Sequence, residues 1–163
     1  MTYTLRPFKV GDAPALAALT LNAIQTIGAQ AYSPEQVRVW SSGHIQAEQF
    51  VARAEAGQHI YVIMDEAGEL AAYALLEPDG HLDMLYCSHK HSGRGLAARL
   101  LDHAESEAVK MGVTKLYTEA SELARGPFER AGYALLKRRD FEMHGVAIHN
   151  YAMEKNLAEI HPS

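Results

Sequence analysis

The sequence lacks three features that would place it in other classes of protein. It has one cysteine, Cys87, which cannot form an internal disulfide and is typical of a reducing compartment. Its formal net charge is −5, whereas a nucleic-acid-binding protein needs a basic face, so we expect no nucleic-acid partner. No apolar run approaches the roughly 20 residues of a membrane span, and residues 1–7 do not resemble a secretion leader. We therefore expect a cytoplasmic protein with no membrane partner.

The apolar pattern predicts a single α/β (α+β) domain. Strands are predicted at 2–8, 58–64, 70–76, 81–87, 113–119, 133–138 and 146–154. Helices are predicted at 13–27, 34–41, 96–111 and 122–131, with a further helical piece at 46–56. In the order β-α-α-β-β-β-α-β-α-β-β, they give a mixed, mostly antiparallel sheet of six or seven strands flanked by about four helices. We expect one domain over 1–163, with an N-terminal part at 2–56, a core at 57–132 and a strand pair at 133–155.

The stretch 82–101 is the most informative part of the sequence. An apolar strand is followed by a polar turn, and Gly93, Gly95 and Ala97 lack bulky side chains where the next helix begins. A helix N-terminus carries unpaired N–H groups and about half a positive charge. Small residues there allow an anion to approach the backbone, so this stretch predicts a phosphate-binding site.

Other interpretations of the glycines compete with this one. A P-loop is excluded because no Gly-Lys-Ser/Thr follows the glycines. The dinucleotide pattern G-x-G-x-x-A is satisfied from Gly93 to Ala98, with Glu119 as a candidate ribose ligand, which leaves an NAD(P)-binding oxidoreductase as a less favoured alternative. That pattern normally follows the first strand of a βαβ unit, whereas here three antiparallel strands precede it. A tight strand-to-helix connection without a ligand is the remaining alternative.

From His81 to Glu154 the sequence resembles the GNAT superfamily of acyl-CoA-dependent N-acyltransferases. The phosphate loop of that family, Q/R-x-x-G-x-G/A, is matched by Ser92-Gly93-Arg94-Gly95-Leu96-Ala97, with serine at the usual glutamine or arginine position. A second signature, a short helix ending in Gly-Phe/Tyr, is matched by 120–133. Gly132-Tyr133 and the terminal strand pair look most like a bacterial YafP-like branch. The resemblance implies acetyl-CoA or another acyl-CoA as co-substrate, and a small-molecule or peptide amine as acceptor.

The resemblance also implies which residues bind the acyl-CoA. The pyrophosphate would lie on the N–H groups of the glycine loop, and the pantetheine arm would pair with the preceding strand like an additional strand. A backbone N–H there would polarise the thioester carbonyl. Ser121 has a second interpretation, as the cap of the short helix. The implied contacts are Leu85, Tyr86, Cys87, Ser92, Gly93, Arg94, Gly95, Leu96, Ala97, Ser121 and Phe128.

Transfer to an amine requires removal of a proton, because an alkylammonium has an ordinary pKa of about 10. Asp83 and Glu119, each near the end of a predicted strand, are the candidate bases, with a solvated carboxylate as the alternative for each. Unbroken strand alternation places Asp83 on the same face as His81 and Cys87. We expect Cys87 to be a small buried residue rather than a nucleophile.

Phe128 is the main departure from the family pattern. Many members carry here a tyrosine that protonates the departing thiolate, and phenylalanine has no hydroxyl. Tyr133 is therefore a third candidate catalytic residue, with Tyr117 and water as alternatives. The sequence predicts an N-acetyltransferase that works by direct attack of the amine in a ternary complex. The alternative is a catalytically weak or inactive acyl-CoA-binding sensor or interaction module.

Three further expectations concern metals, partners and the acceptor site. The histidine pairs His89/His91 and His144/His149 have no cysteine or carboxylate at ligand spacing, so we expect no metal. We expect a monomer or a homodimer. Tyr32, Trp40 and Phe50 lie in the region that often walls the acceptor site in the family, with core packing as their alternative.

Overall fold

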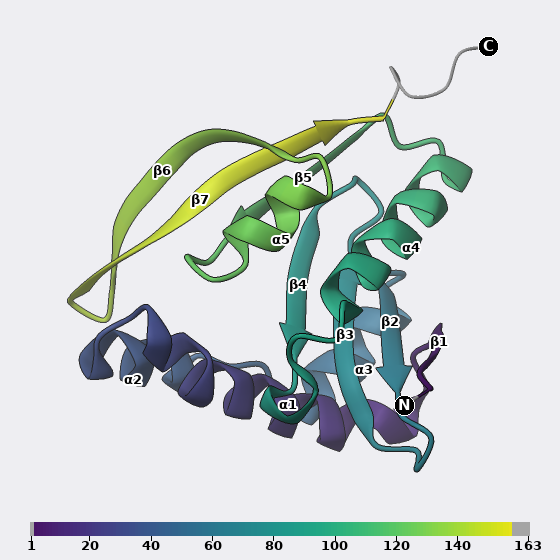
Figure 1. The fold of residues 1–163 in the computed structure, drawn as a ribbon, viewed down its shortest axis with the longest axis horizontal. Helices are drawn as coiled ribbons and strands as arrows, with labels where there is room; N and C mark the ends of the chain where they lie inside the picture. Colours follow the sequence, from purple (N-terminus) through teal and green to yellow (C-terminus); the bar gives the residue numbers. More distant parts are fainter. Residues whose placement is uncertain (1, 158–163) are drawn as a thin grey trace.

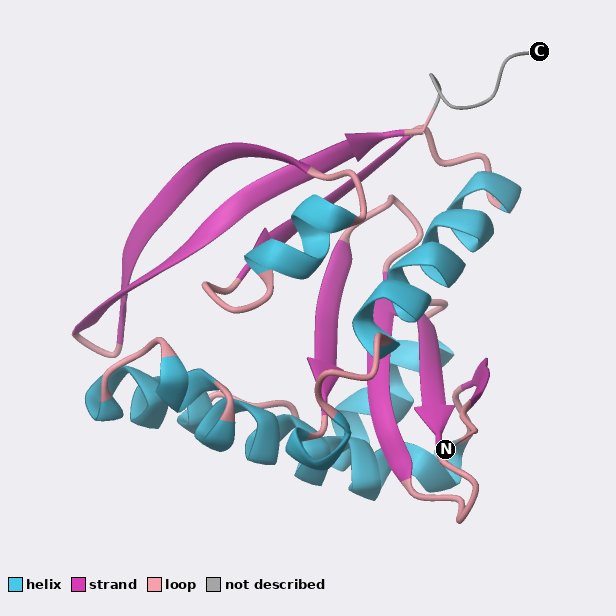
Figure 2. Ribbon diagram, in the orientation of Figure 1, coloured by secondary structure: helices cyan, strands magenta, loops and turns pink. Residues whose placement is uncertain are grey.

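The computed structural model describes residues 2–157 and confirms the predicted α+β order (Figures 1 and 2). The strands are β1 (Thr4–Pro7), β2 (His59–Met64), β3 (Leu70–Leu76), β4 (Leu82–Cys87), β5 (Lys115–Ala120), β6 (Ala134–Met143) and β7 (Val146–Asn156). The α-helices are α1 (Ala13–Thr26), α2 (Pro34–Ser42), α3 (Ala47–Glu55), α4 (Leu96–Lys110) and α5 (Arg125–Arg130). Short 3-10 helices are η1 (Val10–Asp12), η2 (Gly28–Gln30) and η3 (His89–His91). Within 2–157, no helix is both long and apolar enough to cross a membrane.

The strands form two antiparallel sheets, of order β1-β2-β3-β4 and β5-β7-β6. The sheets meet where β4 and β5 begin, at an isolated parallel bridge between His81 and Tyr117. There the Tyr117 N–H donates to the Gly80 carbonyl at 3.1 Å, and the Thr118 hydroxyl donates to the Leu82 carbonyl at 2.7 Å. Beyond this junction β4 and β5 diverge (Figure 1). The predicted sheet is therefore split between two strands that run parallel, as the intervening helix requires.

Gly80 makes the junction between the sheets possible. Its φ is +103°, and a Cβ at this position would lie 2.2 Å from the Lys115 carbonyl oxygen. Any other residue would need both a left-handed backbone and a displaced β5. The start of the divergence is therefore fixed by one glycine.

Helices cover both faces of the first sheet, and β3 alternates between them (Figure 2). Ala72 and Ala74 pack in a core cluster with α4, whereas Tyr73 and Leu75 pack in a second cluster with α1 and α3. All four side chains are fully buried. Burial of each large side chain contributes about 1.5–3 kcal/mol, so β3 is a rigid base for the neighbouring β4.

The register of β4 changes at Asp83. Leu75 and Leu76 of β3 pair with Met84 and Leu82, so Asp83 is an additional residue without a partner on β3. Leu82 and Leu85 consequently pack in the same core cluster, which unbroken alternation would prevent. The expectation that Asp83 shares a face with Cys87 through regular alternation is therefore wrong. Such bulges redirect side chains and are frequent beside active sites.

Candidate active site

The glycine loop leaves open space beside the start of α4. Gly93 and Gly95 both have φ +75°, and a Cβ built on either would meet no atom within 4 Å. Gly95 is the N-cap of α4, and no side chain caps the helix there. The first N–H groups of α4 therefore face a space that a side chain would fill, and together with the helix dipole they favour an anion.

This space is part of the glycine-loop groove, which lies between the start of α4 and the segment around α5. Ser92, Gly93, Gly95, Leu96 and Ala97 line it, as the sequence predicts, whereas the exposed Arg94 does not. Two cations that the sequence analysis did not identify also line it, Arg130 at the end of α5 and Lys155 on β7.

Lys155 is fixed in place within the groove wall. Its ammonium donates to the Ala131 carbonyl at 2.7 Å and pairs with Glu105. Its side chain is only 18% exposed. Because Lys155 and Arg130 come from elements after the loop in the chain, the loop sequence contains no signal of their position.

A strand gap continues from the groove between the diverging strands. Leu85, Tyr86 and Cys87 of β4 form one side, and Ser121, Ala124 and Pro127 lie opposite. Cys87 and Pro127 also line the glycine-loop groove. Leu85, Tyr86, Ser121 and Ala124 also line the next pocket, so the three cavities adjoin one another along shared walls and are together called the cleft.

Two side chains in the strand gap have defined states. The Ser121 hydroxyl accepts a hydrogen bond from the Ala124 N–H at 3.2 Å, within the turn that precedes α5. The N-cap of α5 is Ala124, which no side chain caps. Burial raises the pKa of the Cys87 thiol, which disfavours the nucleophilic thiolate. The gap is therefore a passage with little reactive chemistry of its own.

The far end of the cleft is the carboxylate pocket, lined by the side chains Asp83, Glu119, Tyr32, Trp40, Phe128 and Phe141 among others. Asp83 comes from the bulge of β4 and Glu119 from the end of β5, so the divergence of the strands opens the pocket between them. Asp83 and Glu119 remain partly accessible, with side chains 29% and 34% exposed. The structure brings these two predicted residues together.

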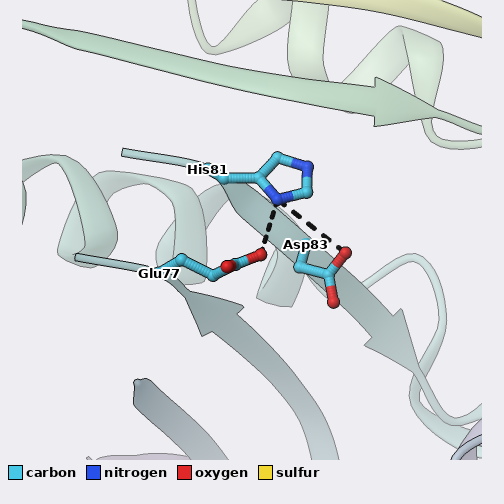
Figure 3. Close-up of side chains that lie close together, drawn as sticks. All are labelled: Glu77, His81 and Asp83. Atoms are coloured by element: carbon cyan, nitrogen blue, oxygen red, sulfur yellow. Dashed lines mark hydrogen bonds and ion pairs between the residues drawn. The ribbon is translucent and has the colours of Figure 1, made fainter. Parts of the chain in front are cut away.

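An ion-pair network contacts both carboxylates, and Figure 3 shows three of its members, Glu77, His81 and Asp83. Arg53 of α3 donates to Asp83 at 2.6 Å and lies 3.6 Å from Glu77. The His81 ring bridges Glu77 at 2.6 Å and Glu119 at 2.8 Å. Burial lowers the pKa of His81, but these two hydrogen bonds and the charges of Glu119 and Asp83 together raise it by more, so it lies above its ordinary value.

The same network includes a geometric arrangement that resembles a metal site. One ligand atom each from Glu77, His81 and Asp83 lies within 4.8 Å of the others. Arg53 already contacts both carboxylates, so a cationic group occupies the charge-balancing position. We therefore interpret this cluster as an ion-pair network that orients the side chains of the pocket.

Tyr133 lies apart from Asp83 and Glu119. It lines the glycine-loop groove, is 4% exposed, and its hydroxyl has no hydrogen-bond partner among the described residues. Burial raises its pKa well above the ordinary value for tyrosine, so the hydroxyl keeps its proton. Phe128 stands between the two regions: it lines the carboxylate pocket and its ring packs edge-on to Tyr133 with centroids 4.9 Å apart.

Tyr117, the other tyrosine considered as an acid, points elsewhere. Its hydroxyl donates to Asp79, which together with burial raises its pKa to about 12. Its ring stacks on His81 with centroids 4.7 Å apart. Tyr117 therefore supports the network behind the pocket.

The remaining pocket walls come from both ends of the chain. Tyr32 and Trp40 line the pocket and pack edge-on at 5.5 Å, whereas Phe50 is fully buried in the core. Phe141 and His149, from β6 and β7, were not predicted as site residues. Both are only partly exposed, and no local sequence pattern distinguishes them from the other residues of the hairpin.

His149 is fixed at the rim of the pocket by neighbours from two elements. Its Nε2–H donates to the Glu122 carboxylate at 2.6 Å, and this bond lowers the pKa of Glu122. The Tyr32 hydroxyl donates to the His149 carbonyl at 3.1 Å and accepts from the Glu122 N–H at 2.8 Å. Strand β7 is thereby tied to Tyr32, just before α2, and to Glu122, in the loop before α5.

Comparisons with known proteins match this architecture. A family model described as an acetyltransferase (GNAT) domain matches residues 28–155. The uncharacterized N-acetyltransferase YafP of Escherichia coli (strain K12) is 26% identical over 149 residues, covering 91% of this chain and 93% of YafP.

Solved structures give the same result. A GCN5-related N-acetyltransferase from Rhodopseudomonas palustris superposes with a TM-score of 0.85 at 32% identity, covering 96% of this chain and 97% of that one. The putative acetyltransferase yncA from Salmonella typhimurium, solved with acetyl-CoA, superposes with a TM-score of 0.76 at 17% identity, covering 100% and 98%. At that identity the second match concerns the fold alone.

Proposed function

The chain belongs to the GNAT acetyltransferase family, and from the geometry of its site we propose that it transfers an acetyl group from acetyl-CoA to an amine. One observation carries this proposal: a single cleft joins an anion-binding loop to a pair of accessible carboxylates. The strand gap between them is bounded on one side by the backbone of β4. This order of features matches a donor that is anionic at one end and reactive at the other.

On the donor side, the backbone does most of the binding. The N–H groups at the start of α4 hold the pyrophosphate, and Arg130 adds positive charge from the opposite wall. Lys155 lines the same groove, with its charge paired to Glu105. The space left by Gly93 and Gly95 fits a phosphate group. Between β4 and Ser121–Pro127, the pantetheine arm lies along Leu85–Cys87 and brings the thioester to the carboxylate pocket.

At the pocket, the amine attacks the thioester carbonyl directly. A nitrogen–carbon bond forms, the carbon–sulfur bond breaks, and the ammonium proton passes to Asp83 or Glu119. A backbone N–H of β4 stabilises the developing charge on the carbonyl oxygen; removing such a donor in other enzymes costs about 10²–10³ in rate. Arg53 and His81 hold the two carboxylates in position for the proton transfer.

Phe128 supports a second candidate function, an acyl-CoA-binding module without turnover. It places a hydroxyl-free ring in the pocket wall, where a proton donor for the departing thiolate would be useful. A thiol with an ordinary pKa of about 8.5 departs as thiolate without help, so we favour transfer.

Release of the CoA thiol from acetyl-CoA in the presence of a panel of amines separates the two functions. Transfer predicts amine-dependent release, with initial-rate lines that intersect when both substrates are varied. Parallel lines would instead indicate a covalent acetyl-enzyme and contradict direct attack. Calorimetric binding of CoA with no release for any amine would establish the binding module.

A further inference from the structure

We propose that the acceptor is a monocationic amine with a flat, aromatic body and without a carboxylate on the carbon beside the nitrogen. This rests on the proposed transfer to an amine and specifies the class of amine. Three properties of the carboxylate pocket support it: its walls are aromatic, its net charge is negative, and the neighbouring cations are paired with other side chains of the protein.

The walls of the pocket are aromatic on several sides. Tyr32 and Trp40 from the N-terminal helical region, Tyr86 from β4 and Phe141 from β6 all line it. Aromatic faces attract a cation within about 6 Å of the ring centre, and aromatic rings pack against one another edge-on or offset. Burial raises the pKa of Tyr32, and raises that of Tyr86 to about 12, so both phenols stay neutral. The walls therefore suit a flat apolar body that carries positive charge.

The charge behind these walls is negative. Asp83 and Glu119 reach the pocket, and Glu77 completes the network that holds them. Against these three carboxylates stand Arg53, which is always charged, and His81. The network has a net negative charge whether or not His81 is protonated. An ammonium placed between Asp83 and Glu119 is stabilised in either state.

No lysine or arginine among residues 2–157 lines the pocket. The Arg53 guanidinium already donates to Gln58 at 2.5 Å and to Asp83 at 2.6 Å, and it lies 3.6 Å from Glu77. An α-carboxylate on the acceptor would therefore meet Asp83 and Glu119 without a counter-cation.

Two other basic groups lie close to the rim. Arg139 donates to Asn150 at 3.1 Å, and its guanidinium lies 5.6 Å from the centre of the Phe141 ring. His149 is paired with Glu122. Arg139, which neighbours the pocket residues Phe141 and Asn150, is the candidate counter-cation for an amino-acid acceptor, and it is included in the test.

Trp40 provides a direct readout, because it is the only tryptophan of the chain and lines the pocket. With the protein saturated with CoA, its fluorescence is titrated with phenethylamine, phenylalanine and phenylalaninamide. Phenylalanine differs from phenethylamine by the α-carboxylate alone, and the amide matches its size without its charge. We expect phenethylamine and phenylalaninamide to bind at least about tenfold more tightly than phenylalanine. Hexylamine, which has no ring, should bind several-fold more weakly than phenethylamine.

Substitutions test the cause of this preference. Glu119→Gln should weaken phenethylamine binding and reduce the difference in affinity between phenethylamine and phenylalanine. Arg139→Gln should leave that difference unchanged. Equal or tighter binding of phenylalanine, a loss of phenylalanine binding in Arg139→Gln, or no saturable signal with any of the ligands would overturn the inference. If phenethylamine binds with the expected preference but no amine releases CoA thiol, the inference stands and the proposed transfer fails. If CoA thiol is released and amino acids are the preferred acceptors, the proposed transfer stands and the inference fails.

Discussion

The glycine-loop groove and the carboxylate pocket lie in one cleft but are built differently. One wall of the groove is a run of consecutive residues at the start of α4, where the glycines leave open space and no side chain caps the helix. The pocket is made from side chains of α2, β4, β5, β6 and β7, brought together by the divergence of two strands. A backbone site binds the same donor whatever side chains surround it, whereas a side-chain site changes its ligand with each substitution. The groove therefore indicates the donor that is common to the family, whereas the pocket indicates the acceptor of this protein.

The largest effects should come from the carboxylates of the pocket. Asp83→Asn and Glu119→Gln each remove a negative charge with little change in shape. The variant that lacks the proton acceptor should have a kcat/KM lower by about 10²–10⁴. The other variant should mainly have a higher KM for the amine. Thiol-release kinetics distinguish them, and Asp140→Asn on the exposed strand β6 is the control. Unchanged kinetics in both variants would remove the pocket from the mechanism.

The next largest effect should come from Gly95→Val. The new side chain would point into open space in the groove, so it should weaken CoA binding about 100-fold, or about 2.8 kcal/mol. Calorimetry measures this directly. Gly112→Val is the matched control, because Gly112 also has a left-handed φ, of +80°, with no atom within 4 Å, but lies beyond the other end of α4. Equal loss of CoA affinity in both variants would mean that strain, rather than blockage, is responsible.

A smaller effect is expected for Phe141→Ala. Phe141 lines only the carboxylate pocket, and its ring is half-buried. Loss of one aromatic wall should raise the KM of an aromatic amine by about five- to tenfold, with the KM of acetyl-CoA unchanged. Leu136→Ala, on the exposed part of the same strand, is the control. A change in the acetyl-CoA KM would show that the two regions are coupled.

The smallest effect concerns the pH dependence of stability through His81. Because the pKa of folded His81 is raised, its ion pairs stabilise the protein fully below about pH 6.5, and this contribution is lost as pH rises through the folded pKa. The difference in Tm between the native protein and His81→Gln should therefore shrink from pH 6 towards about pH 9. Glu119→Gln, which removes one partner, should reduce the same dependence. A difference that grows with pH would contradict the network.

Most of the groove could be predicted from the sequence and little of the pocket could. Gly93 and Gly95 combine small size with a position at a helix start, and that is a local signal. The bulge at Asp83 and the division of the sheet depend on pairing between distant strands, which alternation along one strand does not reveal. Lys155 and Phe141 reach the site only through the curvature of the β6–β7 hairpin.

Initial rates measured with both substrates varied test the division of the cleft most directly. Gly95→Val and Phe141→Ala are compared with the native protein, with acetyl-CoA and phenethylamine as the pair. We predict that Gly95→Val raises the KM of acetyl-CoA alone and Phe141→Ala raises the KM of the amine alone. If both variants raise the KM of the same substrate, the backbone groove and the side-chain pocket do not bind separate partners.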